Sequence, residues 1–176
     1  GFAVVKLQEA VALRDGGVSK PILLMGPFND AELEDLAERT ITPMVYTAIG
    51  DTLDRCARKL GRPIDIHVCV DTGIGRVGVP FRQAAPLIRD LATRTTVRLA
   101  GTMMTFSEDP EFDREQLRRF QELCSALEEG GLHLGKKHAA SSFGLFGDSD
   151  AFLDMVRPGM ALFGIYSEPE FRTSGV

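Results

Sequence analysis

Short apolar segments alternate with amphipathic helices along the whole chain, and this alternation constrains the fold more than any other feature. Seven segments are short, apolar and bounded by glycine, proline or polar residues, which is typical of buried strands. They cover residues 2–5, 21–25, 43–47, 64–70, 97–106, 134–140 and 155–163. Strands that alternate with helices form βαβ units, so we expect a parallel sheet with right-handed crossovers.

The segments between the strands carry the start and stop signals of helices. Asn29 with Glu32, and Asp113 with Gln116, match the spacing of a capping box, which begins a helix. The second pattern predicts that the longest helix begins at Asp113, and Gly130 predicts its end.

Seven units in uninterrupted sequence favour an α/β fold, a parallel (β/α)8 barrel of the TIM type that lacks one unit. Such a barrel typically needs about 250 residues, and this chain has 176. A doubly wound open sheet is the alternative. No linker or shift in composition divides the chain, so residues 1–176 are treated as one partial barrel domain.

Charge and composition narrow the classes of partner. The formal net charge is −5 and the basic residues are scattered, so we expect no nucleic-acid partner, because nucleic-acid binders usually concentrate basic residues on one face. No apolar run approaches the ~18 residues that span a bilayer, and no membrane partner is expected. Three cysteines without paired spacing indicate reduced thiols in a cytoplasmic protein, and the three histidines show no metal-binding spacing.

A glycine-rich segment follows the clearest strand. Gly73-Ile-Gly75-Arg76-Val-Gly78 matches the G-x-G-x-x-G pattern of dinucleotide-binding folds. That interpretation is rejected, because Pro80 suits the first turn of a helix that starts after the glycines, and the next strand offers no acidic residue for a ribose. We expect instead a ligand-binding loop at the end of a barrel strand, in which Arg76 presents a planar fork to a carboxylate.

Two further segments follow in order, His138-Ala-Ala-Ser141-Ser142 and Asp154-Met-Val-Arg157-Pro-Gly159-Met160-Ala-Leu-Phe-Gly164. Together with the Val70-Asp-Thr-Gly-Ile-Gly-Arg76-Val-Gly-Val79 segment, they make the chain resemble the alanine racemase family, the fold type III pyridoxal-phosphate enzymes. The resemblance covers residues 2–166. It implies pyridoxal 5′-phosphate as cofactor, an amino acid as small-molecule substrate with alanine as the default, racemisation by proton removal and return at Cα, and a homodimer.

The resemblance also implies roles for individual residues. Arg157 matches the arginine that points at the pyridine nitrogen of the cofactor, and His138 matches the histidine that fixes this arginine. Arg76 matches the arginine that meets the phenolic oxygen of the cofactor and the carboxylate of the substrate. The phosphate would be held by the Ser142 hydroxyl beside Ser141, and by the backbone amides of Gly159 and Met160.

Three positions depart from the family pattern. Cys69 stands where a carbamylated lysine orients the arginine matched by Arg76, and Thr105 stands where a histidine supports the second catalytic base. Ser141 replaces an asparagine beside the phosphate serine. Because these changes alter the supports of proton transfer more than the cofactor cradle, two alternatives stay open: an enzyme that acts on another amino acid, and a pyridoxal-phosphate-binding protein without turnover.

The resemblance places two functional elements outside the chain. The first barrel strand, with the lysine that binds the cofactor, would precede Gly1, and a C-terminal β domain with a catalytic tyrosine would follow Val176. We therefore expect a fragment that does not racemise amino acids by itself. The predicted site residues Arg76, Thr105, Ser141 and Arg157 are expected near the C-terminal ends of the strands, facing one cavity.

Overall fold

The computed structural model describes residues 1–147, 149–166 and 169. Its strands are β1 (Phe2–Val4), β2 (Ile22–Leu24), β3 (Thr42–Val45), β4 (Ile64–Asp71), β5 (Val79–Pro80), β6 (Val97–Met103) and β7 (Lys136–His138). Its α-helices are α1 (Leu7–Asp15), α2 (Asp30–Glu38), α3 (Gly50–Leu60), α4 (Phe81–Thr93), α5 (Pro110–Glu129) and α6 (Ser142–Gly147). Two short 3-10 helices follow, η1 (Ser149–Ala151) and η2 (Met160–Phe163).

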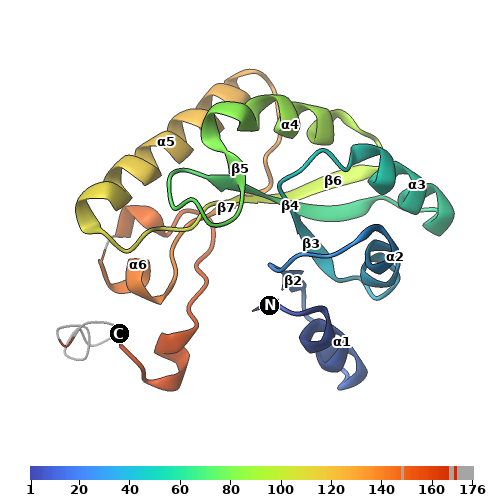
Figure 1. The fold of residues 1–176 in the computed structure, drawn as a ribbon, viewed down its shortest axis with the longest axis horizontal. Coiled ribbons are helices and arrows are strands. Elements are labelled where there is room, and N and C mark those ends of the chain that lie inside the picture. The colour runs from blue at the N-terminus through green and yellow to red at the C-terminus, as the bar shows by residue number, and fades with distance from the viewer. Residues whose placement is uncertain (148, 167–168, 170–176) are drawn as a thin grey trace.

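The strands form one parallel sheet in which spatial order follows chain order. The order is β1-β2-β3-β4-β6-β7, and the two-residue β5 pairs with β4. The sheet curves, and α1 to α5 lie along its convex side (Figure 1). A doubly wound sheet reverses its strand order and carries helices on both faces, so that alternative is wrong here. The predicted barrel is confirmed as a wall of about half a barrel.

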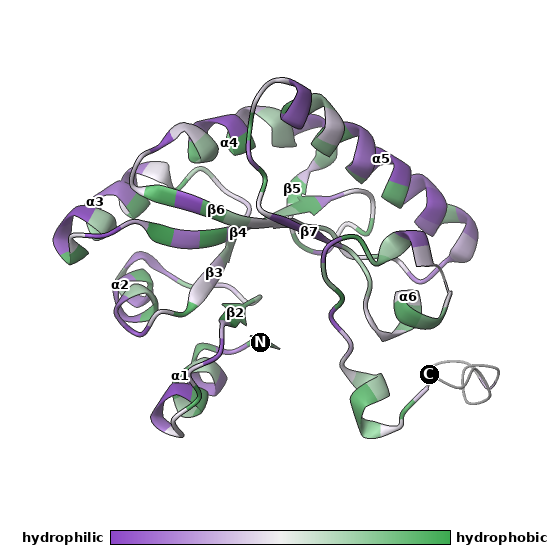
Figure 2. Ribbon diagram, turned by 180° about the vertical axis from the view of Figure 1, so that it is seen from behind, coloured by the Kyte–Doolittle hydropathy of each residue, from purple (hydrophilic) through white to green (hydrophobic). Residues whose placement is uncertain are grey.

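The main core lies between the outer face of the sheet and the helices. Alternate residues of β4 point outward into this core, because successive side chains of a strand face opposite sides. Hydrophobic and hydrophilic residues are interspersed along the ribbon of α5 (Figure 2), and its buried residues are Gln116, Leu117, Phe120, Cys124 and Leu127. The inner face carries a smaller apolar cluster of Leu23, Met44, Cys69 and Met103.

The predicted strand at residues 155–163 is wrong. Residues 154–157 run beside β7, where the Asp154 amide donates to Lys137 O and the Arg157 amide donates to Ala140 O. A regular ladder does not form, because the Asp154 carboxylate accepts the Lys137 amide at 2.7 Å. Pro158 then has no amide to offer, and the chain turns into η2.

The predicted start of the longest helix is also wrong. Helix α5 begins at Pro110, and the Asp109 carboxylate caps it by accepting the amides of Glu111 and Phe112. The Asp113 carboxylate instead accepts both the amide and the hydroxyl of Ser107. Helix α2, by contrast, has the predicted capping box of Asn29 and Glu32. Strand β5 was not predicted.

Candidate functional site

Four predicted site residues lie at the same end of the sheet. Arg76 follows β4, Thr105 follows β6 and Ser141 follows β7. The Arg157 side chain reaches the same end, because its guanidinium donates to carbonyl oxygens just beyond β6 and β7. A cavity of about 810 Å³ beside α5 and α6 is lined by none of these four residues. The structure therefore gathers them at one end, and their shared cavity stays a prediction.

Arg157 is held by three neutral acceptors. Its guanidinium lies 2.6 Å from Nδ1 of His138 and donates to the carbonyl oxygens of Met104 at 2.8 Å and Ala139 at 2.9 Å. No carboxylate within residues 1–147, 149–166 and 169 forms an ion pair with it. Burial lowers the pKa of Arg157 to about 10. A half-buried cation with only neutral partners is costly, which indicates a site built to meet a further acceptor.

Two histidines continue the hydrogen bonds from Arg157. Burial and then the charge of Arg157 lower the pKa of His67 to about 4 and that of His138 to about 2, so both rings are neutral at pH 7. Because a guanidinium only donates, Nδ1 of His138 accepts and its ring proton sits on Nε2. This Nε2–H donates to Nδ1 of His67, 2.8 Å away, which accepts the hydrogen bond.

Ser142 collects two backbone amides. Its Oγ accepts from the amide of Gly159 at 2.9 Å and from that of Ala161 at 3.1 Å. A Cβ at Gly159 would meet no atom within 4 Å, so the space beside this amide is open. A hydroxyl and convergent amides suit a phosphate. The Met160 amide does not donate to Ser142, and its predicted contact with the phosphate stays a prediction. Ser141 accepts the Phe143 amide with its hydroxyl in the first turn of α6.

Arg76 lies on a loop that Asp71 holds in place. One carboxylate oxygen of Asp71 accepts the amides of Gly73 at 2.9 Å and Gly75 at 3.2 Å. Gly78 has φ +122°, and a Cβ there would lie 2.6 Å from the Asp71 nitrogen, so glycine is required. The Arg76 side chain is exposed and makes no hydrogen bond or ion pair with the part of the chain that the structure describes. Its guanidinium is available to a carboxylate.

Gln116 on α5 joins the Arg76 loop to Thr105. Its amide nitrogen donates to Thr72 Oγ1 at 3.2 Å and to the carbonyl of Thr105 at 3.3 Å. Its oxygen accepts the amide of Ser107 at 2.9 Å. The side chain is fully buried. One residue thus fixes the spacing between the two loops that carry the predicted catalytic residues.

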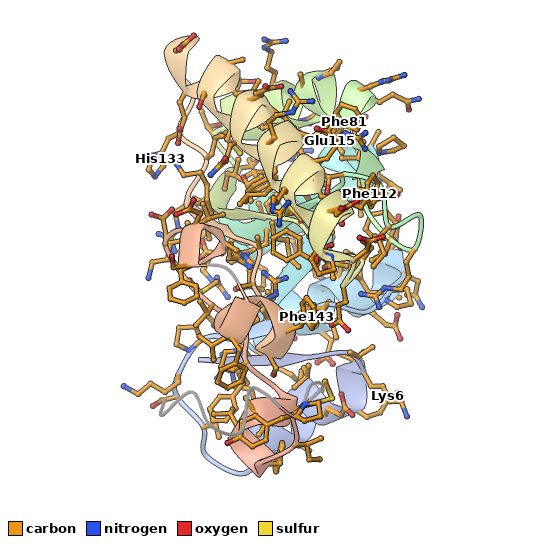
Figure 3. All side chains as sticks on the ribbon, turned by 90° about the vertical axis from the view of Figure 1, so that its left-hand side faces the viewer. Lys6, Phe81, Phe112, Glu115, His133 and Phe143 are labelled. Carbon is orange, nitrogen blue, oxygen red and sulfur yellow. The ribbon has the colours of Figure 1, made fainter. Side chains whose placement is uncertain are left out.

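Arg119, one helical turn further on, supports the same loop. It donates to the carbonyl of Thr72 at 2.8 Å and pairs with Glu115 at 2.8 Å. Its guanidinium lies over the rings of Phe81 and Phe112, 5.0 and 5.4 Å from their centroids. Figure 3 shows Phe81, Phe112 and Glu115 on the same side of the molecule. Helix α5 therefore holds the loop in place through both Gln116 and Arg119.

Cys69 lies on the inner face of β4 and touches the loop that carries Arg76. Its Sγ is 3.8 Å from the carbonyl oxygen of Val77, and burial raises the pKa of the thiol to about 12. The thiol is therefore protonated and brings no charge to Arg76. This is the physical consequence of having cysteine at this position.

Residues 1–167 match the family described as alanine racemase, N-terminal domain. The chain belongs to the alanine racemase family. It is 32% identical over 171 residues to an alanine racemase of Methanococcus maripaludis, covering 94% of this chain and 46% of that relative. It is 36% identical over 169 residues to an alanine racemase of Syntrophobacter fumaroxidans, covering 93% and 44%.

Solved structures of the same family share the fold. The structure of alanine racemase from Clostridium difficile 630 in complex with cycloserine superposes with a TM-score of 0.91 at 27% identity, covering 96% of this chain and 48% of that one. An alanine racemase from Bacillus anthracis with bound L-Ala-P gives a TM-score of 0.82 at 25% identity, covering 97% and 45%. The chain spans about half the length of the relatives that it matches. None of the described helices combines the length and apolar character needed to cross a membrane.

Three residues of the site were not predicted from the sequence. His67 is one of the polar residues that alternate with apolar residues along β4, and its partner His138 is 71 positions away. Gln116 has the spacing of a capping residue, which concealed its buried role. Ala161 contributes only its backbone, which carries no side-chain signal.

Proposed function

We propose that the protein containing this chain is a pyridoxal-phosphate-dependent alanine racemase, and that this chain supplies much of the barrel wall that holds the cofactor. The observation that carries the proposal is Arg157, a half-buried guanidinium whose described partners are all neutral. Membership of the alanine racemase family supports the cofactor and the reaction class.

The residues present suit pyridoxal phosphate. When bound, the cofactor would withdraw electrons from Cα of the amino acid and so allow its proton to leave. Arg157 would hold the pyridine nitrogen, where a fixed cation disfavours protonation. Ser142, with the backbone amides of Gly159 and Met160, would hold the phosphate; the structure supports this arrangement by bringing the Gly159 and Ala161 amides to the Ser142 hydroxyl. The two anchors are brought together in space, because the Arg157 amide donates to the carbonyl of Ala140, two residues before Ser142.

Arg76 and Thr105 would serve the amino acid. The exposed Arg76 offers two parallel N–H groups that orient a carboxylate. By the resemblance, Thr105 occupies the position of the residue that supports the second proton-exchanging group. Gln116 donates to the backbone carbonyl of Thr105 and fixes it in place. The resemblance assigns the proton exchange to a lysine and a tyrosine outside these 176 residues. We further propose a homodimer that works in the cytoplasm, as the resemblance implies.

A racemase for another amino acid is the second candidate, and the chemistry of Cys69 favours it. A protonated thiol brings no negative charge to Arg76, so Arg76 relies more on the ligand itself to fix its position. A panel of L-amino acids given to the same protein separates the two candidates. Turnover highest with alanine supports the first, and turnover highest with a larger or polar amino acid supports the second.

The test uses the full-length protein that contains this chain. Pyridoxal phosphate is titrated by absorbance, and D-alanine formed from L-alanine is measured by chiral chromatography. Ser142→Ala should weaken cofactor binding about tenfold, because one hydrogen-bonding group of the phosphate is lost. Ser125→Ala, on the exposed face of α5, should bind as the wild type does. Binding without turnover would indicate the cofactor-binding protein, and no binding would contradict the proposal.

A further inference from the structure

The position of His67 is fixed by its contact with a second histidine and by the local shape of β6. Its ring meets the ring of His138 edge to face, with centroids 4.9 Å apart and Nδ1 2.8 Å from Nε2 of His138. Both residues lie on the inner face of the sheet, on β4 and β7, and β6 lies between these strands. The hydrogen bond therefore passes over β6.

Strand β6 is shaped to let the two rings meet. Gly101 is the residue of β6 that pairs with His67, and a Cβ there would lie 2.6 Å from both Cε1 and Nδ1 of the ring. The register between β4 and β6 also shifts next to this pair, between Ile66 and His67. A missing side chain and an irregular register at the same place indicate that the contact is built into the sheet.

The direction of each hydrogen bond is fixed by chemistry. Arg157 has no acceptor, so Nδ1 of His138 must accept from it. A neutral His138 then carries its proton on Nε2 and needs an acceptor there, which His67 supplies through Nδ1. If His138 changed tautomer, its Nδ1–H would face the N–H of Arg157, and the hydrogen bond would be lost.

We propose that His67 is a positioning residue of the cofactor site: by accepting the Nε2 proton of His138, it fixes the tautomer that turns Nδ1 toward Arg157 and so holds the guanidinium in place. The inference rests on the proposed function only for the group that Arg157 contacts, which is the pyridine nitrogen of the cofactor. The tautomer itself follows from the geometry. His67 touches neither the cofactor anchors nor Arg157 through any described hydrogen bond, and it acts through His138.

The charged groups around the pair favour neutral rings. Arg157 and Lys136 disfavour a cationic His67, and Asp65 favours one more weakly than burial opposes it. Around His138 the opposing groups are Arg157 and His67 itself. Two neutral rings leave one proton on each, which is the arrangement that the hydrogen bonds require.

The experiment is nitrogen-15 NMR of the histidine rings in the full-length protein, followed by variants. We expect His67 and His138 each to show a protonated Nε2 and a bare Nδ1. His67→Leu removes the acceptor, so the His138 signals should change, the absorption of bound pyridoxal phosphate should shift, and kcat should fall roughly ten- to a hundredfold with little change in KM. His67→Asn, whose Oδ1 can replace Nδ1, should restore most of kcat.

The matched control is His133→Leu, since His133 is exposed and precedes β7 at the end of that strand opposite to His138. It should leave tautomers, absorption and kcat unchanged. The inference is overturned if His67→Leu keeps the His138 tautomer and kcat, or if His138 carries its proton on Nδ1 in the wild type. If His67→Leu does not fold, His67→Asn decides, and loss of the His138 tautomer there overturns the inference. A wild type that binds no cofactor would contradict the proposed function. The histidine tautomers, measured by NMR, would still test the role of His67.

Discussion

The two ends of the parallel sheet use arginine in opposite ways. At the N-terminal ends of β4 and β6, Arg98 forms a bidentate pair with Asp65 at 2.6 and 2.5 Å. Arg94, just before β6, contacts three carboxylates, those of Asp51, Asp54 and Asp90. Hydrogen bonds to these carboxylates raise the pKa values of both arginines. At this end of the sheet both arginines are paired with carboxylates of the same chain, and these ion pairs serve folding.

At the C-terminal ends, Arg157 has only neutral partners and burial lowers its pKa to about 10, while Arg76 is exposed and unpaired among the described residues. At the second end Arg119, which supports the loop from α5, is paired with Glu115, whereas Arg76 and Arg157 have no carboxylate partner among the described residues, and this indicates that these two arginines serve a ligand. The comparison thus separates residues that stabilise the barrel wall from residues that serve its chemistry.

The largest effect is expected from Arg157→Met in the full-length protein. Racemisation should fall about a thousandfold, as when one preorganised donor is removed from an active site. Stability should change little, because removal of a half-buried cation without an anionic partner is offset by the loss of the donor to His138, Met104 and Ala139. Chiral chromatography and thermal unfolding measure the two effects. Arg118→Met, at an exposed position paired with Glu115 and Glu122, is the control, and a loss of activity that only follows unfolding would refute the distinction.

Gln116→Leu should affect both stability and activity. The Ser107 amide and Thr72 hydroxyl lose a buried partner, so the free energy of unfolding should fall by about 2 kcal/mol. Because Gln116 spaces the Arg76 and Thr105 loops, kcat/KM should fall about tenfold as well. Gln121→Leu, exposed on the same helix, should change neither by a comparable amount. Unchanged kcat/KM in folded Gln116→Leu would show that loop spacing is unimportant.

The two histidines predict how stability depends on pH. Their folded pKa values, about 4 for His67 and about 2 for His138, lie below the ordinary 6.5 because burial disfavours the cation. The unfolded chain takes up protons below about pH 6.5 while the folded chain does not. Their stabilisation is therefore complete above that pH and is lost as the pH falls toward 4.

Urea titrations between about pH 6 and about pH 4.5 measure this effect. For each unit by which the pH falls in this window, each histidine should lower the free energy of unfolding by about 1.4 kcal/mol. His67→Asn should reduce the combined slope by about half. A slope that is the same in the variant would mean that His67 is charged in the folded state.

The smallest effect is expected from Arg94→Met. Loss of the contacts to Asp51, Asp54 and Asp90 should lower the Tm by a few degrees, because these pairs hold the end of α4 to α3. The activity of the folded protein should not change, since Arg94 belongs to the end of the sheet that serves folding. A selective loss of activity would break the comparison between the two ends.

Local patterns predicted the fold well where one segment determines its own structure. The period of apolar residues identified the helices and six of the seven predicted strands, and the capping box of Asn29 and Glu32 formed as expected. Prediction failed where a distant or competing group decides the outcome. The Asp154 carboxylate takes the Lys137 amide and prevents a strand, and Asp109 rather than Asp113 caps α5.

The site shows the same division. Arg76, Thr105 and Ser141 could be placed because each follows a strand, and parallel strands bring their C-terminal ends together. The contact of His67 with His138 depends on two strands separated by β6 and on Gly101 between them. No local pattern encodes a hydrogen bond between residues so far apart, and its detection required the three-dimensional register.

The state of the pyridine nitrogen tests the central claim most directly. Pyridoxal phosphate labelled with nitrogen-15 on the ring is bound to the full-length protein, and its chemical shift is compared with that in Arg157→Glu. The account predicts an unprotonated nitrogen that accepts from Arg157 in the wild type, and a protonated nitrogen in the variant, because a carboxylate favours the neighbouring cation. A protonated nitrogen in the wild type, or the same shift in both proteins, would contradict the role of the unpaired arginine.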